Sequence, residues 1–291
     1  MARKSWTAQF AAQIPITRGG FEINQPGRYI VVRNLVCAGT GIRITASHVH
    51  VNLADHTITG ARADTAIDVS DASDVHVIGG TIQQFAVGVR LIRVTESSLS
   101  GVVVGDNVTD GILLEDSHRN HIKRNFIRGN GALGMHVIRS RNNGLSRNVV
   151  AQPQAGVSLE AATENTLTDN TIVASTGGVL VDTGSDGNIL AGNIIAVAAV
   201  LANLGCATVH LGGSNGTCSH NIIGGNCEYG IRVMNGSTGY FIHDNSIVGN
   251  HSLADMADFN LPACVNTWQN NSFATDNESA TAFGPGAGCI Q

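Results

Sequence analysis

Three consecutive lines of the chain align under one another: Gly111-Ile-Leu-Leu-Glu115 with Asn125-Phe-Ile127, Gly134-Met-His-Val-Ile138 with Asn148-Val-Val150, and Gly156-Val-Ser-Leu-Glu160 with Asn170-Thr-Ile172. The glycines step by 23 and then 22 residues, and the asparagines do the same. A period this short leaves no room for a strand–helix–strand unit. Rungs of this length bury their apolar faces by stacking on one another, so the spacing predicts a solenoid built of strands.

The same pattern continues on both sides of these three lines. Further segments of the first-strand type begin at Gly41, Ala66, Gly88, Gly178, Thr208 and Gly230. The period lengthens once, to 28 residues between Asn193 and Asn221, and the surplus is the apolar stretch 196–206. That stretch predicts either a short helix packed outside the stack or a wall over the adjacent groove, with an oligomer contact as a further alternative.

The ends of the chain depart from the repeat. We expect an N-terminal cap segment over residues 1–20, the solenoid over 21–250 and a C-terminal capping tail over 251–291. Caps are expected because an open solenoid end would expose its core and its strand edges. Trp6, Phe10, Ala11 and Ile14 have helix-like spacing and could cover the first rung.

Composition and charge agree with stacked rungs and indicate two different ends. Charged residues make up only 13% and aromatic residues 4%, as expected for many short strands with small polar residues outside. Up to Arg147 the chain carries 16 basic and 11 acidic residues, whereas from Asn148 onward Arg232 alone faces 11 acidic residues. This asymmetry could steer a charged ligand or direct contacts between copies in a homo-oligomer.

Cysteine usage favours export from the cytoplasm. Cys264 and Cys289 bracket a polar tail that a disulfide could clamp onto the last rung, and Cys206, Cys218 and Cys227 cluster in the sequence. The alternative is that the cysteines are small buried apolar residues, as we expect for Cys37. The basic start has no apolar run behind it, so we find no export signal and no membrane span in the sequence. We expect an extracellular or periplasmic protein, with a cytoplasmic one as the alternative.

Two columns of outward-facing side chains predict where function lies. In a Gly-Ile-x-Leu-x strand the Ile and Leu face inward and the two x positions face out. The columns, which we call the central stripe, are Arg43, Asp68, Arg90, Leu113, His136, Ser158, Leu180, His210 and Arg232, and Thr45, Ser70, Ile92, Glu115, Ile138, Glu160, Asp182, Gly212 and Met234. We expect catalysis at His136, Glu160, Asp182, Glu115 and His210, and substrate binding at Arg90, Ser158, Leu113, Leu180 and Arg232.

Acid–base chemistry is the reason for this choice. Glu160 and Asp182 are predicted to stack one rung apart, where two carboxylates disfavour each other's ionisation, so one could hold a proton or the pair could hold calcium. His136 lies diagonally from Glu115 and Glu160, and an imidazole held by a carboxylate suits proton transfer. The alternative is that these groups only make an exposed sheet soluble. No cofactor is required, with calcium as the one candidate.

Two other groups of residues could bind a metal ion or a charged sugar. His48 and His50 alternate along one strand near His56, and we favour a solvated strand over a metal site there because no cysteine or carboxylate converges on them. A basic run, formed by Arg119, Lys123, Arg124, Arg128, Arg139, Arg141 and Arg147, could bind sulfated or uronate sugars or be a set of solvated turns. Nucleic acid is not expected, because the net charge is −5 and no aromatic residues interleave.

The stretch from Gly41-Ile-Arg-Ile-Thr45 to Asp55-His-Thr-Ile-Thr-Gly60 resembles the opening rungs of bacterial right-handed parallel β-helix repeat proteins, the pectate-lyase-like superfamily. Gln25-Pro-Gly-Arg-Tyr29 and the ending Cys264-Val-Asn-Thr-Trp268 … Cys289 are similar to the same group. The resemblance covers residues 21–291 and implies an all-β fold, a single-stranded right-handed parallel β-helix of about ten rungs of 22–24 residues. It also implies a sugar-directed function with its site on one parallel sheet.

The functional expectation follows from both arguments. We expect a carbohydrate-active enzyme, a polysaccharide lyase, epimerase or glycoside hydrolase, that acts on a poly- or oligosaccharide in a groove by acid–base catalysis. One alternative is a non-catalytic carbohydrate-binding or surface scaffold. The other is an isomerase or cyclase of a small, partly apolar molecule, because the stripe contains Leu, Ile and Met while Trp6 and Trp268 lie at the ends.

Overall fold

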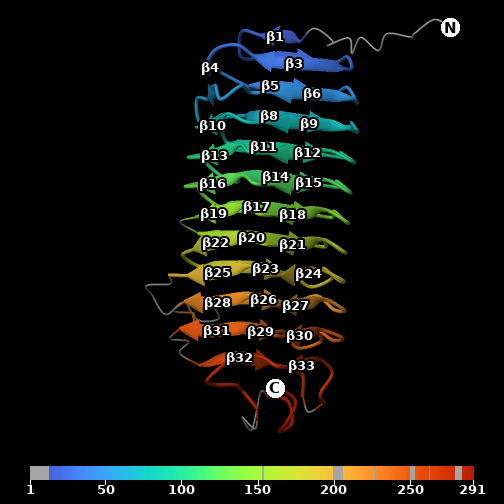
Figure 1. Cartoon of the computed structure of the whole chain (residues 1–291), viewed down its shortest axis with the longest axis vertical. Coiled ribbons are helices and arrows are strands. Elements are labelled where there is room, and N and C mark those ends of the chain that lie inside the picture. The colour runs from blue at the N-terminus through green and yellow to red at the C-terminus, as the bar shows by residue number, and fades with distance from the viewer. Residues whose placement is uncertain are drawn as a thin grey trace, which may run out of the picture.

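The computed structural model describes residues 13–152, 154–198, 206–225, 227–249, 253–261, 263–278 and 284–291. In these ranges every regular element is a strand, and the strands stack as successive rungs along one long axis (Figure 1). All strand pairs are parallel, and each strand pairs with its counterparts in the rungs before and after it. The chain is therefore the predicted all-β parallel solenoid of about ten turns.

Three parallel sheets form the sides of the stack, numbered here in the order in which each regular rung passes through them, as in β5, β6 and β7. Sheet 1 has 11 strands: β2 (Phe21–Ile23), β5 (Ile42–Ile44), β8 (Thr65–Ser70), β11 (Val87–Ile92), β14 (Ile112–Glu115), β17 (Leu133–Ile138), β20 (Ala155–Glu160), β23 (Gly177–Val181), β26 (Ala207–Leu211), β29 (Tyr229–Val233) and β32 (Ala254–Asp258). Sheet 2 has 12 strands: β1 (Ile14–Ile16), β3 (Gly27–Val31), β6 (Val49–Asn52), β9 (Val75–Ile78), β12 (Ser98–Ser100), β15 (His121–Lys123), β18 (Gly144–Ser146), β21 (Thr166–Thr168), β24 (Ile189–Ala191), β27 (Thr217–Ser219), β30 (Phe241–His243) and β33 (Thr267–Gln269). Sheet 3 has 10 strands: β4 (Leu35–Val36), β7 (Thr57–Thr59), β10 (Thr81–Gln83), β13 (Val103–Gly105), β16 (Phe126–Arg128), β19 (Val149–Ala151), β22 (Thr171–Ala174), β25 (Ile194–Val197), β28 (Ile222–Gly225) and β31 (Ser246–Gly249).

The core runs through the middle of the stack and is built from the inward residues of all three sheets. Sheet 1 contributes two inward side chains per rung, such as Met135 and Val137, while sheets 2 and 3 contribute one each, such as Leu145 and Val150. These side chains are fully buried. Burial of aliphatic side chains in continuous columns supplies the main stabilising free energy of such a fold.

Sheet 2 is the part that the repeat did not reveal. The aligned lines show two strands in each rung, but the segment between them contains a third strand, which is three residues long in β15, β18 and β21. Each of these strands buries a single side chain between two polar ones, for example Ile122 in His121–Lys123. One apolar residue among polar ones carries too weak an alternation to be recognised as a strand.

The repeated asparagines form buried ladders at the corners. The side chain of Asn148 donates from Nδ2 to Oδ1 of Asn170 at 3.1 Å and to the carbonyl oxygen of Ile122 at 2.8 Å. Its own Oδ1 accepts from the backbone N–H and the Nδ2 of Asn125. The ladder continues through Asn193, Asn221, Asn245 and Asn271. Each amide satisfies backbone groups that the bend of the chain leaves without a strand partner.

The repeated glycines before sheet 1 also have a steric cause. A Cβ on Gly134 would lie 2.7 Å from the carbonyl oxygen of Gly156 in the next rung, and a Cβ on Gly156 would lie 2.6 Å from that of Gly178. Side chains at these positions would therefore force neighbouring rungs apart. This close approach explains why glycine returns with the period of the rungs.

The stack extends past both limits that we set for it. Ile14–Ile16, placed in the predicted cap, form β1 and pair with β3, so Ile14 lies in a strand; residues 1–12, with Trp6, Phe10 and Ala11, lie outside the described residues. Beyond residue 250, β32 pairs with β29 and β33 pairs with β30. Strand pairing in register thus continues beyond the predicted bounds at both ends.

Four of the six cysteines form disulfides. The predicted bridge between Cys264 and Cys289 is present, and Cys206 bonds to Cys227, while Cys37 and Cys218 are free and buried. Of the surplus stretch 196–206, Ala196 and Val197 belong to β25 and residues 199–205 lie outside the described residues. The described ranges contain no helix that is long and apolar enough to span a membrane.

Candidate functional site

The central stripe exists on the outer face of sheet 1 in the predicted register. Leu113 is opposite His136, His136 is opposite Ser158, and Ser158 is opposite Leu180. The column continues through His210 to Arg232. These side chains are partly exposed, except for Ser158, which is 5% exposed. The sequence therefore located these positions correctly on one face, and their contacts decide what each can do.

The imidazole of His136 lies between two carboxylates. Its Nε2 is 2.9 Å from Oε1 of Glu160, and its Nδ1 is 3.3 Å from Oδ2 of Asp110. Asp110 is held in place because its Oδ1 accepts a hydrogen bond from the backbone N–H of Leu133. The contact with Glu160 is the one expected from the sequence. The second carboxylate is not the expected Glu115, because Asp110 takes that place from the turn before β14.

This environment favours the protonated form of His136. Burial on the outer face opposes the charge, but the hydrogen bonds and the negative charges of Asp110 and Glu160 outweigh it and raise the pKa of His136 above its usual value. As an imidazolium, His136 donates to both carboxylates. Because Nε2 of His136 faces Oε1 of Glu160, a proton can move between these two atoms.

Glu160 borders a hollow on the outer face of sheet 1. This central hollow has a volume of about 260 Å³ and is lined by Ser158, Glu160, Leu180, Val181, Asp182 and His210. The Ser158 hydroxyl lies 3.5 Å from Oε1 of Glu160. The predicted neighbours Glu160 and Asp182 thus line one hollow, whose wall has four polar residues and the apolar residues Leu180 and Val181. The calcium predicted for this pair stays a prediction.

His210 faces the same hollow in its neutral form. Burial and the positive charge of Arg232 lower the pKa of His210 to about 4, and only the charge of Asp182 opposes them. Arg232 donates from Nη2 to Nδ1 of His210 at 2.9 Å, so the ring hydrogen is on Nε2. The guanidinium also lies over the ring of Tyr229, 5.6 Å from its centre. His210 can therefore donate a hydrogen bond, whereas Arg232 is committed to orienting it.

Two other predicted residues are engaged elsewhere. Arg90 forms a two-pronged pair with Asp68, at 3.0 and 3.1 Å, and Asp68 is only 6% exposed. Glu115 pairs with Arg139, which also binds Asp116. Neither Arg90 nor Glu115 lines the central hollow. These ion pairs hold neighbouring rungs together, and the roles predicted for Arg90, Glu115 and Leu113 remain untested.

Several arginines of the basic run are paired in the same way. Arg119, Arg128, Arg139 and Arg147 lie within 4.0 Å of carboxylates on adjacent rungs, namely Glu96, Asp106, Asp116 and Asp169. All these side chains are largely exposed, where an ion pair contributes little to stability. The pairing reduces the positive charge that this surface presents to a ligand.

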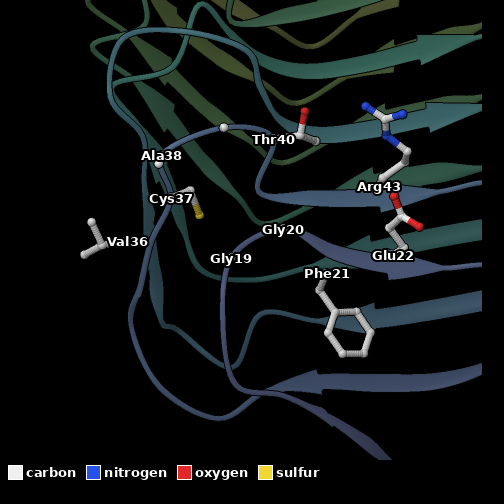
Figure 2. A pocket seen from close by; sticks show the side chains of 10 residues that line it. Gly19, Gly20, Phe21, Glu22, Val36, Cys37, Ala38, Thr40 and Arg43 are labelled. Atoms are coloured by element: carbon white, nitrogen blue, oxygen red, sulfur yellow. The ribbon is translucent and has the colours of Figure 1, made fainter.

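A second hollow lies at the N-terminal end of the stack. It has a volume of about 400 Å³ and is bordered by the loops that precede β2 and follow β4 (Figure 2). Its wall is mostly backbone, with the buried thiol of Cys37 against Gly19. Burial raises the pKa of the Cys37 thiol, which keeps it in the unreactive form. Glu22 and Arg43 at its edge are opposite each other on β2 and β5, and Arg43 is the first residue of the central stripe.

A cluster of metal-ligand side chains lies on sheet 2 near the C-terminal end. His220, His243 and Asp244 bring one ligand atom each to within 4.8 Å of one another. Nδ1 of His243 is 2.7 Å from Oδ2 of Asp244, and Nε2 of His220 is 3.8 Å from the same oxygen. The His243 ring stacks on Phe241 with ring centres 4.0 Å apart. In the described part of the chain no other group of three such residues meets this criterion.

This cluster was not predicted, because its signal in the sequence is weak. His220 and Asp244 follow the last residues of β27 and β30, with positive φ angles of 55° and 54°. His220 is thus one rung before Asp244 at the same corner, and the backbone N–H of His220 donates to the carbonyl oxygen of His243. The shared corner follows from the strand register, which becomes visible only once the strands of sheet 2 are known.

Comparison with solved structures shows the fold alone. The lid-free DFA-IIIase of Arthrobacter chlorophenolicus A6 superposes with a TM-score of 0.57 at 12% identity, covering 85% of this chain and 83% of that one. The Dettilon tailspike protein superposes with a TM-score of 0.56 at 15% identity, covering 81% of this chain and 61% of that one. At such identities a shared β-helix carries no statement on function. No curated protein matches the sequence.

A family comparison goes further than the fold. Residues 21–203, more than half of the chain, match the sequence model of the family described as periplasmic copper-binding protein (NosD). The expected location outside the cytoplasm is confirmed, because the family is periplasmic and the two disulfides agree with an oxidising compartment. The resemblance to parallel β-helix proteins is confirmed as well. With its fold, its disulfides and this match, the chain belongs to the NosD family.

Proposed function

We propose that this protein binds an oligosaccharide over the central hollow and transfers protons to and from it through Glu160, with His136 behind it. One observation carries the proposal: the imidazole of His136 binds both Asp110 and Glu160, and Glu160 lines the central hollow together with Asp182 and His210. Sugar hydroxyl and carboxylate groups are matched by hydrogen-bond donors and acceptors on a rigid sheet. Stacked strands hold such groups more firmly than loops do.

Each side chain has a distinct part in this function. Glu160, whose side chain is 44% exposed, meets the ligand and takes or gives the proton. His136 is a positioning residue, because its imidazolium stabilises the carboxylate and supplies the proton when Glu160 needs one. On the other side of the hollow the Nε2–H of His210 donates to a ligand oxygen, and Asp182 accepts from a hydroxyl group. Lyase, epimerase and hydrolase reactions all require such an acid and base.

The test is a ligand screen followed by paired substitutions. Polyuronates and neutral glycans are screened for unsaturated products, reducing ends and binding. Glu160→Gln and His136→Ala should each lower turnover by about 10²-fold or more, because proton transfer contributes factors of this size. Glu164→Gln is the matched control, since Glu164 is an exposed carboxylate on a turn bound to Asn142. Activity that survives both changes would rule out this hollow as the active site.

The same screen separates the two alternative functions. Glycan binding that depends on Glu160 and His210 without any product would identify a non-catalytic carbohydrate-binding protein. No response to any glycan would favour a small, partly apolar substrate, for which Leu180 provides the apolar contact in the hollow. Both alternatives use the residues of the central hollow, so the substitutions remain informative.

A second candidate function, copper binding, is favoured by the family description and by the cluster of His220, His243 and Asp244. Two imidazoles and one carboxylate suit copper, which binds such sites more tightly than other divalent first-row metals. The donor set therefore fits a copper ion. These residues lie after the matched region 21–203, so the cluster is assigned from this chain's own geometry.

Copper binding can be tested without any enzymatic assay. Cu(II) is titrated into the metal-free protein and followed by calorimetry and electron paramagnetic resonance. His220→Gln and His243→Gln should each weaken binding at least tenfold and remove one nitrogen from the copper signal, because each removes an imidazole ligand. His121→Gln, an exposed histidine elsewhere on sheet 2, is the control. Equal copper affinity in all four proteins would exclude this cluster.

A further inference from the structure

An arginine and two histidines form a column on the outer face of sheet 2, near the N-terminal end. Arg28 of β3 is opposite His50 of β6, and His50 is opposite His76 of β9. The two imidazole rings lie 4.7 Å apart between their centres. This column is separate from the central stripe, which lies on sheet 1, and from the copper-ligand cluster near the other end of sheet 2.

The three side chains border a hollow of their own. It has a volume of about 170 Å³, and its wall includes Arg28, His50 and His76 together with the polar side chains of Gln13 and Asn52. Among the residues that the structure describes, none with a carboxylate lines this hollow. A hollow with one guanidinium, two imidazoles and two amides, and without an acidic side chain, has the charge and the donors that an oxyanion requires.

The hydrogen bonds of the column leave donors available. Both ring nitrogens of His76 are engaged, Nε2 with Asp74 at 2.8 Å and Nδ1 with the Ser98 hydroxyl at 2.7 Å. Asp74 also binds His48, so its charge is shared between two histidines. By contrast, neither Arg28 nor His50 forms a side-chain hydrogen bond or an ion pair with another described residue. Within the described residues, Arg28 and His50 therefore have donors available at the hollow.

The charges around His50 favour its neutral form, as expected for a site without its anion. Burial lowers the pKa of His50, the positive neighbours His76 and Arg28 lower it further, and only Asp74 opposes them. An anion placed between Arg28 and His50 would reverse this effect and favour the imidazolium. Protonation of His50 and binding of an anion are then linked, so each promotes the other.

We propose that Arg28 and His50, with His76 behind them, form a binding site for an oxyanion, a sulfate or the sulfate ester of a sugar. Arg28 binds two oxygens through its planar guanidinium, and His50 donates a further hydrogen bond. His76 is a positioning residue, since Asp74 and Ser98 fix its ring against that of His50. The site requires no metal and no movement of the sheet.

The experiment measures binding of sodium sulfate, an ion that keeps its double charge over the pH range used. Calorimetry and histidine NMR are carried out at constant ionic strength between pH 5 and 8. Sulfate should bind more tightly as the pH falls through the pKa of His50, and saturating sulfate should raise that pKa. Arg28→Gln should weaken binding at least tenfold, and His50→Gln should remove most of the pH dependence. His121→Gln, in the same column two rungs beyond His76, should change neither.

Two further outcomes are decisive. A sulfated monosaccharide that binds more tightly than inorganic sulfate identifies the ester as the ligand, and equal affinities identify the free anion; either result supports the site. Sulfate binding that is equal in the wild type, Arg28→Gln and His50→Gln proteins would overturn the proposal, and so would a His50 signal that responds to neither compound. Far-ultraviolet circular dichroism checks that each variant retains its strands.

Discussion

Nε2 of His136 lies 2.9 Å from Oε1 of Glu160, although 24 residues separate the two in the sequence. The two lie on adjacent rungs, where His136 is opposite Ser158 and Glu160 is opposite Ile138, so their contact runs diagonally across the strand register. Asp110 completes the arrangement from the rung before. The three ionisable groups therefore act as one unit whose protonation depends on the packing of three successive rungs.

The stability conferred by His136 should decrease as the pH rises. The raised pKa means that the folded protein holds this proton more tightly than the unfolded chain does. The stabilisation is thus complete below the ordinary histidine pKa and is lost as the pH passes through the raised value. Urea unfolding of wild type and His136→Gln should differ by about 2 kcal/mol at pH 5.5 and by much less at pH 8.5. A difference that grows with pH would contradict this assignment.

Asp110, which sequence reasoning overlooked, should control the imidazole. Asp110→Asn removes one negative charge and one charge-assisted hydrogen bond, so the pKa of His136 should fall, as measured by histidine NMR. Any turnover found in the central hollow should then have an optimum at lower pH. Asp106→Asn is the matched control, because Asp106 is exposed and pairs with Arg128 at 3.9 Å. An unchanged His136 titration would remove Asp110 from the site.

His210 should behave in the opposite way. Its pKa of about 4 means that the folded state resists protonation, so the stabilisation is present above the ordinary histidine pKa and is lost as the pH falls towards 4. The effect amounts to at most ~3 kcal/mol. Arg232→Met removes the nearby positive charge and should raise the pKa of His210, which NMR can follow. A His210 signal that titrates normally in the wild type would show that Arg232 does not hold it neutral.

Replacing one member of the asparagine ladder should destabilise the whole stack. Asn170→Ala leaves the backbone N–H and the Nδ2 of Asn148 and the carbonyl oxygen of Leu145 without their partner. Unsatisfied buried groups of this kind cost about 2–4 kcal/mol in total, measured by urea unfolding. Thr168→Ala on the neighbouring strand is the control and should change stability by less than about 1 kcal/mol. Equal effects would mean that the ladder contributes no more than the surface.

The sequence was sufficient to predict the fold because each signal of the repeat has a physical cause in the stacked rungs. Gly134 and Gly156 mark the close approach of rungs, Asn148 and Asn170 mark a corner, and Met135 and Val137 mark the inner face. Each signal recurs in every rung, so one misinterpreted position does not change the predicted fold. Most strands of sheet 2 were missed because a strand such as β15 or β18 buries only one side chain, whereas β6, which buries Val49 and Val51, showed its alternation in the sequence.

The candidate site could be predicted only in part. Alternation along sheet 1 places His136, Glu160 and His210 on one face, because a strand has a period of two. It does not identify contacts from the turns, and Asp110 and Arg139 reach the stripe from there. The ion pairs that commit Arg90 and Glu115 to neighbouring rungs depend on side-chain conformations, which a repeat pattern does not encode.

The two disulfides should contribute separately to stability. Cys206 and Cys227 are 21 residues apart and connect the starts of adjacent strands β26 and β29, whereas Cys264 and Cys289, 25 residues apart, fasten the C-terminal tail. Closing loops of this size stabilises a protein by about 2–4 kcal/mol, chiefly by restricting the unfolded chain. Removing either pair by double alanine substitution should therefore lower the midpoint of thermal unfolding.

Only the first disulfide should affect the central hollow. Cys206 directly precedes β26, the strand that carries His210, so loss of its bond should weaken ligand binding in the hollow and raise the pKa of His210 as its contact with Arg232 loosens. The Cys264 and Cys289 double variant is the matched control, with a lower melting temperature and unchanged His210 titration. If both variants melt earlier and His210 titrates identically in both, the bond at Cys206 stabilises the stack without holding the site in place.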